Sequence, residues 1–481
     1  MSRDLHRAAV APWTSPGELA PLAGAVLVLS SLALVNGFPI VFEDTGFFLT
    51  TAAIFDIPWN RPMFYGAFLG VTYRALGIWG VVAIQSALTV AILALFLRVA
   101  AGRGARVTFA ASVALALFTS LPWFTGMLMP DVFQAPLVMA CYLLAFHWRE
   151  LGRAARVFCL ALVAGAILVH YANFMLVVGL AALLLLWRAI DRTRPVPLAP
   201  IALMAGIGAL AIALQMTVNY VGYGRPSLSE GAPAYALSRL VDTGLAKRYL
   251  DAHCHEQSYV LCAYRDRPAR YVGWYIFDFE SPFRTVWNRG LAHTDWAVGA
   301  RRSEAESLAI IRGTLGEFPF ATLWQMLVGT AQQLVAIKTA EGVWPNLGRE
   351  WIEAPIHKYF PEIYPAYAGT LQNRGLLPLP SVRALHVLVA SASLLLLTLT
   401  AVRGGLRGHW LGGWTLFLAA AFLQNAVISG TLAGPASRYG SRLAWLFALA
   451  ALLVLVERRA FLAAEWRYFL HPRAKTQGVS S

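Results

Sequence analysis

Two adjacent carboxylates, Glu43 and Asp44, follow directly on the first long apolar stretch of this chain. Neighbouring like charges can retain one proton at a raised pKa, so such a pair suits a general base or a metal-binding carboxylate. A structural interpretation is also open, because an acidic residue before a helix accepts hydrogen bonds from its first N–H groups and favours its dipole. The next segment, up to about Pro58, is expected to form a helix at the membrane interface, anchored by Phe47, Phe48 and Phe55.

Polar residues interrupt the apolar stretches at two further places in the first half of the chain. Asp131 begins an apolar run, where it either caps a helix or joins Glu43 and Asp44 in one site. His170 and Asn173 lie in a short turn between two apolar runs, and we count both among the candidate substrate-binding residues. A histidine there is commonly a hydrogen-bonded structural residue, but at that depth it would also suit a lipid phosphate.

Arg438 and Arg442 precede the last apolar run, on the side of the membrane where our count of spans predicts few arginines. Arginine presents a planar fork of donors that matches phosphate and carboxylate oxygens. We therefore favour anion binding by these two residues, and a miscounted span is the alternative explanation. Arg61 lies close to the first carboxylates and either has the same role or pairs with Asp44.

Cys254 and Cys262 fall in the least apolar part of the chain, whereas the other two cysteines fall in apolar runs. If this part lies in an oxidising compartment, the two are expected to form a short-loop disulfide. A metal site with the neighbouring His253 and His255 is the alternative, but the spacing matches no recognised ligand pattern. The sequence implies no cofactor firmly, and a divalent metal at the carboxylates stays open.

Composition places these residues in a membrane protein. Hydrophobic residues make up 58% of the 481 positions and charged residues 13%, and the mean hydropathy is +0.58. A spanning helix needs about 20 apolar residues, which predicts an all-α polytopic fold of about ten spans. We expect them at about residues 19–40, up to Arg98, up to Pro122, at 130–147, twice within 157–187, and at 198–220, 384–402, 411–428 and 443–456.

The formal charge of +14 comes mostly from arginines in short segments between the apolar runs. This distribution fits the positive-inside rule and not a nucleic-acid surface. It predicts a multi-pass protein, surrounded by membrane lipid, with both termini in the cytoplasm. Together with the resemblance described below, we expect the membrane to be a bacterial inner membrane. Glu43 and Asp44 then lie on the outer side, together with Asp131 and His170.

The chain is expected to have three parts. Residues 1–220 form a transmembrane module with outer loops, residues 221–380 a mixed, mainly helical periplasmic region, and residues 381–481 the C-terminal helices and a cytoplasmic tail. One apolar stretch in the middle part, about 318–337, fits an interfacial helix, a re-entrant element or a true span. A single true span there would place the C-terminal tail on the outer side of the membrane, which argues against it.

Within about the first 190 residues, several short motifs occur together. They are the segment Phe42-Glu43-Asp44-Thr45-Gly46-Phe47, the amphipathic stretch after it, the segment Pro130-Asp131-Val132-Phe133-Gln134-Ala135-Pro136, and the turn at His170-Tyr171. In these motifs the chain resembles the GT-C class of integral-membrane glycosyltransferases, which includes the protein mannosyltransferases and the lipid A aminoarabinose transferases. The remainder resembles that class only in its layout of several spans and an outer region.

The resemblance implies that a sugar moves from a polyprenyl-phosphate donor to a lipid, glycan or protein acceptor on the outer face. By position, Asp44 or Glu43 would deprotonate the acceptor hydroxyl, and Asp131 would place the acceptor or a metal. The order Glu43-Asp44 reverses the Asp-Glu order of the protein mannosyltransferases, so the identity of the base stays open. The donor phosphate would be held, and the leaving group neutralised, by His170, Arg438 and Arg442.

Two other classes of protein compete with this interpretation. A lipid or polysaccharide transporter would carry several ionisable residues at mid-span, whereas the ionisable residues of this chain cluster at one face. A non-catalytic membrane scaffold with a periplasmic interaction domain would tolerate neutralisation of Asp44. The sequence contains no phosphate-cradling glycine loop, no serine nucleophile elbow and no zinc-protease motif, so coupling to bound nucleotide is not expected.

Overall fold

The computed structural model describes residues 16–190, 196–267, 269, 271–292, 295–406 and 409–457. Within these ranges the chain is helical, and the only strand-like pairing is an isolated bridge between Ile40 and Met127. The predicted all-α class is therefore confirmed for the described residues. The predicted cytoplasmic ends of the chain lie outside these ranges.

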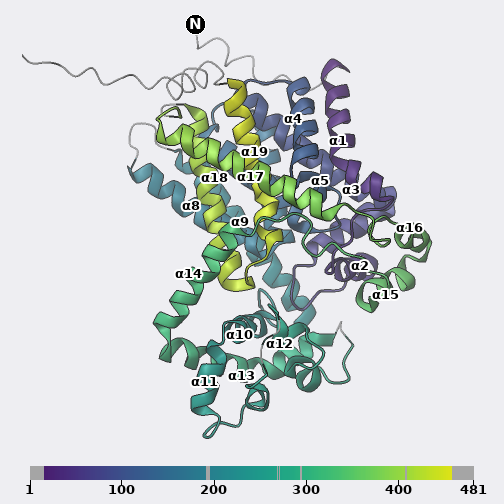
Figure 1. Ribbon diagram of the computed structural model, residues 1–481, viewed down its shortest axis with the longest axis vertical. Coiled ribbons are helices and arrows are strands. Elements are labelled where there is room, and N and C mark those ends of the chain that lie inside the picture. Colours follow the sequence, from purple (N-terminus) through teal and green to yellow (C-terminus); the bar gives the residue numbers. More distant parts are fainter. Residues whose placement is uncertain are drawn as a thin grey trace, which may run out of the picture.

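Seven of the described helices are long and apolar enough to cross a membrane. Their number and composition make the chain a multi-pass membrane protein. In Figure 1 they gather in the upper part of the molecule, above α10 to α13. They are α1 (Pro16–Asn36), α3 (Phe64–Ala101), α8 (Tyr171–Ile190), α9 (Leu198–Tyr223), α17 (Leu379–Val402), α18 (Trp410–Ile428) and α19 (Ser437–Glu457).

The other three predicted spans fall on shorter helices. These are α4 (Ala105–Phe118), α6 (Gln134–Phe146) and α7 (Arg153–Val169), with 14, 13 and 17 residues. The apolar runs that predicted α4 and α6 are divided, because a five-residue helix, α5 (Leu121–Thr125), and a 3-10 turn, η1 (Pro130–Phe133), take up part of their length. A span needs about 20 residues, so the count of ten remains a prediction.

The main hydrophobic core lies between the membrane helices and surrounds α6. Every residue of α6 from Gln134 to Ala145 is buried, because the neighbouring helices α3, α7, α8, α9, α18 and α19 cover it on all sides. A helix that is apolar around its whole circumference is suited to such a position. The turn before α6, residues 129–133, is buried together with it, whereas Arg149 and Glu150 after α6 are exposed.

A second hydrophobic core joins the helices below the bundle. Trp59, from the loop after α2, enters this core and stacks on Phe283 at a ring distance of 5.5 Å. The chain between α2 and α3 therefore ties the two cores together. The helical elements of this part are α10 (Ala232–Asp242), α11 (Leu245–His253), η2 (Val260–Tyr264), α12 (Trp274–Phe277), η3 (Phe283–Trp287) and α13 (Trp296–Glu317).

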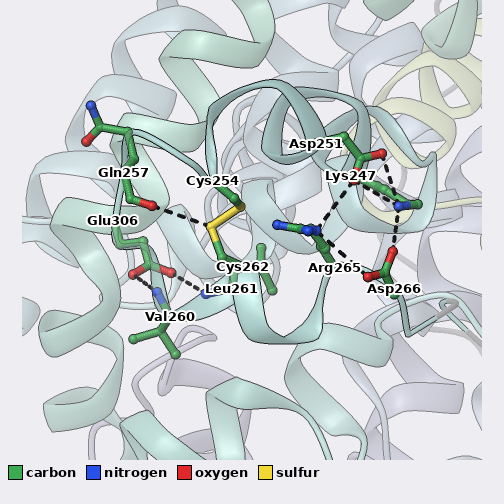
Figure 2. The surroundings of a disulfide bond; sticks show 10 residues. All are labelled: Lys247, Asp251, Cys254, Gln257, Val260, Leu261, Cys262, Arg265, Asp266 and Glu306. Atoms are coloured by element: carbon green, nitrogen blue, oxygen red, sulfur yellow. Dashed lines mark hydrogen bonds and ion pairs between the residues drawn. A yellow bond between two sulfur atoms is a disulfide. The ribbon is translucent and has the colours of Figure 1, made fainter.

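A disulfide between Cys254 and Cys262 closes the loop after α11, with a Cα–Cα distance of 5.7 Å. Figure 2 shows it beside Glu306, whose carboxylate accepts the backbone N–H groups of Val260 and Leu261 at 2.7 and 3.0 Å. Because the two sulfurs are bonded to each other, neither is available as a thiolate ligand for a metal.

The predicted middle part, residues 221–380, is divided between the two cores. Residues before α14 build the second core, whereas residues from Ala340 to Tyr367 pack into the main core. The later segment includes α15 (Glu350–Tyr359), η5 (Pro361–Ile363) and α16 (Tyr364–Ala368). Of these, α15 packs directly against α2 (Thr45–Ile54), as Figure 1 also shows.

The apolar stretch at 318–337 forms α14 (Pro319–Val335), a helix of 17 residues. It crosses the π-turn η6 (Ser429–Ala433), where Gly329 and Gly430 meet backbone to backbone. Phe320, Trp324 and Leu327 are exposed on it. The length falls short of the roughly 20 residues that a span requires.

The helix predicted after the carboxylates is α2, and it ends at Ile54 with Phe55 in the left-handed region. The prediction that Phe48 anchors this helix at the membrane interface is wrong, because Phe48 is buried against Tyr65 at a ring distance of 4.8 Å. Of the predicted anchors, Phe55 is the exposed one, and the Phe47 ring lies under the guanidinium of Arg61.

Candidate functional site

Backbone pairing brings the Glu43–Asp44 loop next to Asp131. The N–H of Ile40 donates to the Gly126 carbonyl at 2.9 Å, and the N–H of Leu128 donates to the Ile40 carbonyl at 3.0 Å. The Thr45 hydroxyl adds a hydrogen bond to the Leu128 carbonyl at 3.2 Å. The chain after α1 and the chain before η1 are thus fixed side by side.

Asp44 occupies the N-cap position of α2, but its side chain makes no cap hydrogen bond. Its carboxylate instead meets two arginines: Arg61 Nη2 lies 3.1 Å from Oδ1, and Arg438 Nη1 lies 3.5 Å from Oδ2. The structural interpretation of Asp44 as a simple helix cap therefore does not describe its side chain.

Asp131 forms the deeper half of the same cluster. Arg442 Nη1 lies 2.9 Å from Asp131 Oδ1, and both side chains are only 1% exposed. Arg438 Nε lies 3.9 Å from the same oxygen, so Arg438 links the carboxylates of Asp44 and Asp131. Arg442 is also held by Asn425, whose Oδ1 accepts from Nη2 at 3.1 Å. We refer to Asp44, Asp131, Arg61, Arg438 and Arg442 as the charge cluster.

Aromatic rings hold two of the guanidinium groups in place. Arg438 lies over Phe42 at 4.2 Å and Arg61 over Phe47 at 4.5 Å from the ring centroids. Such cation–π contacts are strongest where water is excluded. With three arginines against two aspartates, the charge cluster carries an excess of positive charge.

Some polar atoms of the charge cluster have no hydrogen-bond partner in the described protein. They are Asp131 Oδ2 and Arg442 Nε. Gln134, three residues after Asp131, also has no hydrogen-bond partner among the described residues for either atom of its side-chain amide. A buried polar atom without a partner costs free energy of about 1–3 kcal/mol. A polar ligand at this position would satisfy these groups.

The two adjacent carboxylates have opposite electrostatic environments. Burial raises the pKa of Glu43, and the charge of Asp44 adds to this effect, while Arg349 offsets part of it from 3.2 Å. Burial would also raise the pKa of Asp44, but Arg61 and Arg438 together outweigh it and hold that pKa below its usual value. Glu43 is therefore the stronger base of the two, and Asp44 stays ionised between its arginines.

His170 and Asn173 lie at the break between α7 and α8. His170 Nδ1 accepts the N–H of Ala172 at 3.2 Å, and the Asn173 side chain donates to the Ala166 carbonyl at 2.8 Å. His170 is close enough to the charge cluster to feel the charges of Arg442 and Asp131. The Asn173 side chain thus links α8 to α7 through its hydrogen bond to Ala166.

Four residues of the site were missed by sequence reasoning. Arg349 and Glu341 come from the middle part of the chain, where Glu341 Oε2 accepts the backbone N–H of Arg438 at 2.9 Å. No local signal marks either of them. Gln134 and Asn425 could have been found, because each is a polar side chain inside an apolar run.

An apolar cavity of about 320 Å³ opens between α3, η1 and α7. Three of its lining residues stand close in the chain to polar residues of the site: Phe64 follows Arg61, Phe133 follows Asp131, and Val169 precedes His170. The same three chain segments thus supply both a polar group and an apolar wall. We call this cavity the apolar groove.

The donor set does not fit a divalent cation. Asp44 and Asp131 both face guanidinium groups, and the described ranges contain no group of three or more His, Cys, Asp or Glu side chains arranged for a metal. His253, part of the alternative metal site, bonds Glu317 at 2.6 Å, and Cys254 is in the disulfide.

A comparison with protein-family models finds no match, and searches of curated proteins and of solved structures find none either.

Proposed function

We propose that this chain is a membrane glycosyltransferase that moves a sugar from a polyprenyl-phosphate donor to a lipid, glycan or protein acceptor. The observation that carries the proposal is the charge cluster, with its unpartnered buried atoms and its excess of positive charge, together with an apolar groove whose lining residues Phe64 and Phe133 follow Arg61 and Asp131 within three positions. A lipid-linked sugar has the matching form, because an anionic phosphate joins a polar sugar to a long apolar chain.

In this proposal the lipid chain occupies the apolar groove, and the phosphate lies against Arg438 and Arg61. Arginine binds phosphate oxygens through parallel N–H donors. Ligand sites commonly combine apolar walls with a few fixed polar groups. Both arginines are 12% exposed and are held over aromatic rings, so the donors are arranged before the phosphate arrives.

The proposed reaction uses Glu43 as the general base. Glu43 takes the proton of an acceptor hydroxyl while that oxygen bonds to the anomeric carbon of the sugar. The bond between this carbon and the phosphate oxygen breaks, and its electron pair leaves with the polyprenyl phosphate. Arg438 and Arg61 neutralise the charge that develops on the leaving phosphate, and Asp44 keeps both guanidiniums in position.

We place the site on the outer side of a bacterial inner membrane, with the termini in the cytoplasm. The disulfide between Cys254 and Cys262 supports this orientation, because disulfides persist in oxidising compartments. The arginine-rich segments between the apolar runs support it independently.

The test is mass analysis of glycans and glycolipids from cells that lack the gene and carry wild type, Glu43→Gln or Asp44→Asn. Glu256→Gln, which changes an exposed side chain in the loop after α11, is the matched control. We expect one glycan or glycolipid mass to be absent in both site variants and present in the control, at equal membrane expression. Identical profiles in all strains would contradict the proposal and favour a transporter or a scaffold.

A further inference from the structure

Arg349 connects Glu43 with two tryptophan side chains at the outer edge of the site. Its Nη1 lies 3.2 Å from Glu43 Oε1. Its guanidinium carbon lies 5.3 Å from the ring centroid of Trp344 and 5.5 Å from that of Trp351. A carboxylate, a guanidinium and two indoles thus form one continuous group, which we call the aromatic rim.

The aromatic rim is partly exposed, whereas the three arginines of the charge cluster are 12% exposed or less. Trp344 and Trp351 are both 37% exposed, and the Glu43 side chain is 39% exposed. Tryptophan is on average highly buried in folded proteins. Two partly exposed indoles beside a carboxylate are therefore available for contact with a ligand.

The backbone holds the aromatic rim at a fixed position relative to Glu43. A Cβ at Gly46 would overlap the carbonyl oxygen of Trp351, so α15 lies in close contact with α2 immediately after the carboxylates. The Gln372 amide accepts the N–H of Val41 at 3.0 Å and donates to the Trp344 carbonyl at 3.1 Å. Both tryptophans are thereby tied to the loop that carries Glu43.

We propose that Trp344, Arg349 and Trp351 form the subsite for a sugar ring of the acceptor, so that the acceptor is a glycan or glycolipid. The inference rests on the proposed function. A pyranose has an apolar C–H face that stacks on an indole and hydroxyls at its edge that bond charged groups. Arg349 donates to one hydroxyl, and a neighbouring hydroxyl then lies against Glu43, which removes its proton.

The probe is a set of methyl glycosides of glucose, galactose, mannose, rhamnose and N-acetylglucosamine. Binding to the protein in lipid nanodiscs is measured by saturation-transfer NMR. We expect at least one glycoside to bind wild type, and Trp344→Ala and Trp351→Ala to weaken it about fivefold or more. Trp324→Ala removes an indole on α14 that is more exposed, at 64%, and should bind as wild type does.

Trp344→Phe and Trp351→Phe keep an aromatic face and should retain most of the binding, which separates stacking from loss of folding. The subsite is overturned if no glycoside binds, or if both alanine variants bind as well as wild type. Asp44→Asn should bind the glycoside normally while failing to make product. Loss of the subsite and failure of the proposed function therefore give different results.

Discussion

Asp131 and Arg442 stand 311 positions apart in the chain and form an ion pair of 2.9 Å, with both side chains 1% exposed. Charges so deeply buried persist only when they are paired and hydrogen-bonded. The pair joins the start of α19 to the turn before α6, and Arg438, one turn earlier on α19, extends the contact to Asp44. The first and last apolar segments of the chain are thus connected through the candidate site.

Removal of Arg442 should destabilise the protein strongly. Arg442→Met leaves the Asp131 carboxylate buried without its nearest cation, and breaking a buried pair in this way costs about 3–5 kcal/mol. The double variant with Asp131→Asn should recover most of the lost thermal stability, because no charge is then left unpaired. The melting temperatures of the purified proteins in detergent test this, and a double variant less stable than Arg442→Met would contradict it.

Filling the apolar groove should impair binding of the donor. Gly165 lines the groove, and a Cβ there would meet no atom within 4 Å, so Gly165→Leu fits the folded protein but occupies the space for the lipid chain. We expect a higher KM for a polyprenyl-phosphate-linked sugar. Gly206→Leu on α9 is the matched control, because its Cβ also meets no atom within 4 Å. Equal KM values for the two variants would speak against the groove as the lipid site.

The pH dependence of activity should follow Glu43. A base must be deprotonated, so activity rises as pH rises through its pKa, which burial places above the usual value. Arg349 lowers this pKa, so Arg349→Gln should move the acidic limb of the pH profile to higher pH. Arg349→Lys keeps the charge and should restore the limb towards wild type. A limb that stays in place in Arg349→Gln would contradict the assignment of Glu43 as the base.

The orientation can be tested by cysteine labelling in spheroplasts. Wild type should resist a membrane-impermeant maleimide, because Cys254 and Cys262 are disulfide-bonded and the remaining cysteines, Cys141 and Cys159, are buried. Cys254→Ser frees Cys262, which should then react without permeabilisation. Labelling that requires a permeabilised membrane would place this part of the chain in the cytoplasm.

Hydropathy was sufficient to locate the seven helices that are long enough to cross a membrane. It did not show which apolar helices are buried inside the protein. Helix α9, which is long enough to span a membrane, and the buried helix α6 both have apolar sequences, because lipid and the protein interior both favour apolar side chains. Helix α6 therefore could not be distinguished from a lipid-facing span. The division of the apolar run up to Pro122 into α4 and α5 depends on tertiary packing in the same way.

The sequence predicted the residues of the charge cluster and, as one alternative, the pairing of Arg61 with Asp44, which the structure contains. It did not predict the other ion pairs or the four further residues of the site. The charge pattern placed Asp44, Asp131, Arg438 and Arg442 at one membrane face, and the structure brings these four together. Which carboxylate meets which arginine depends on how α19 packs against η1, and a single sequence carries no signal of that contact. Arg349 was missed for the same reason, because α15 reaches α2 only through the folded chain.

The most direct test of the central claim is turnover of the donor lipid. Membranes from cells lacking the gene are fused with vesicles that carry purified wild type, Glu43→Gln or the Glu256→Gln control, and lipids are followed by mass spectrometry. We predict that wild type and the control convert a polyprenyl-phosphate-linked sugar into free polyprenyl phosphate. Glu43→Gln should be slower by a factor of about 10²–10⁴, the usual contribution of a general base. Equal lipid profiles with and without the wild-type protein would contradict the claim.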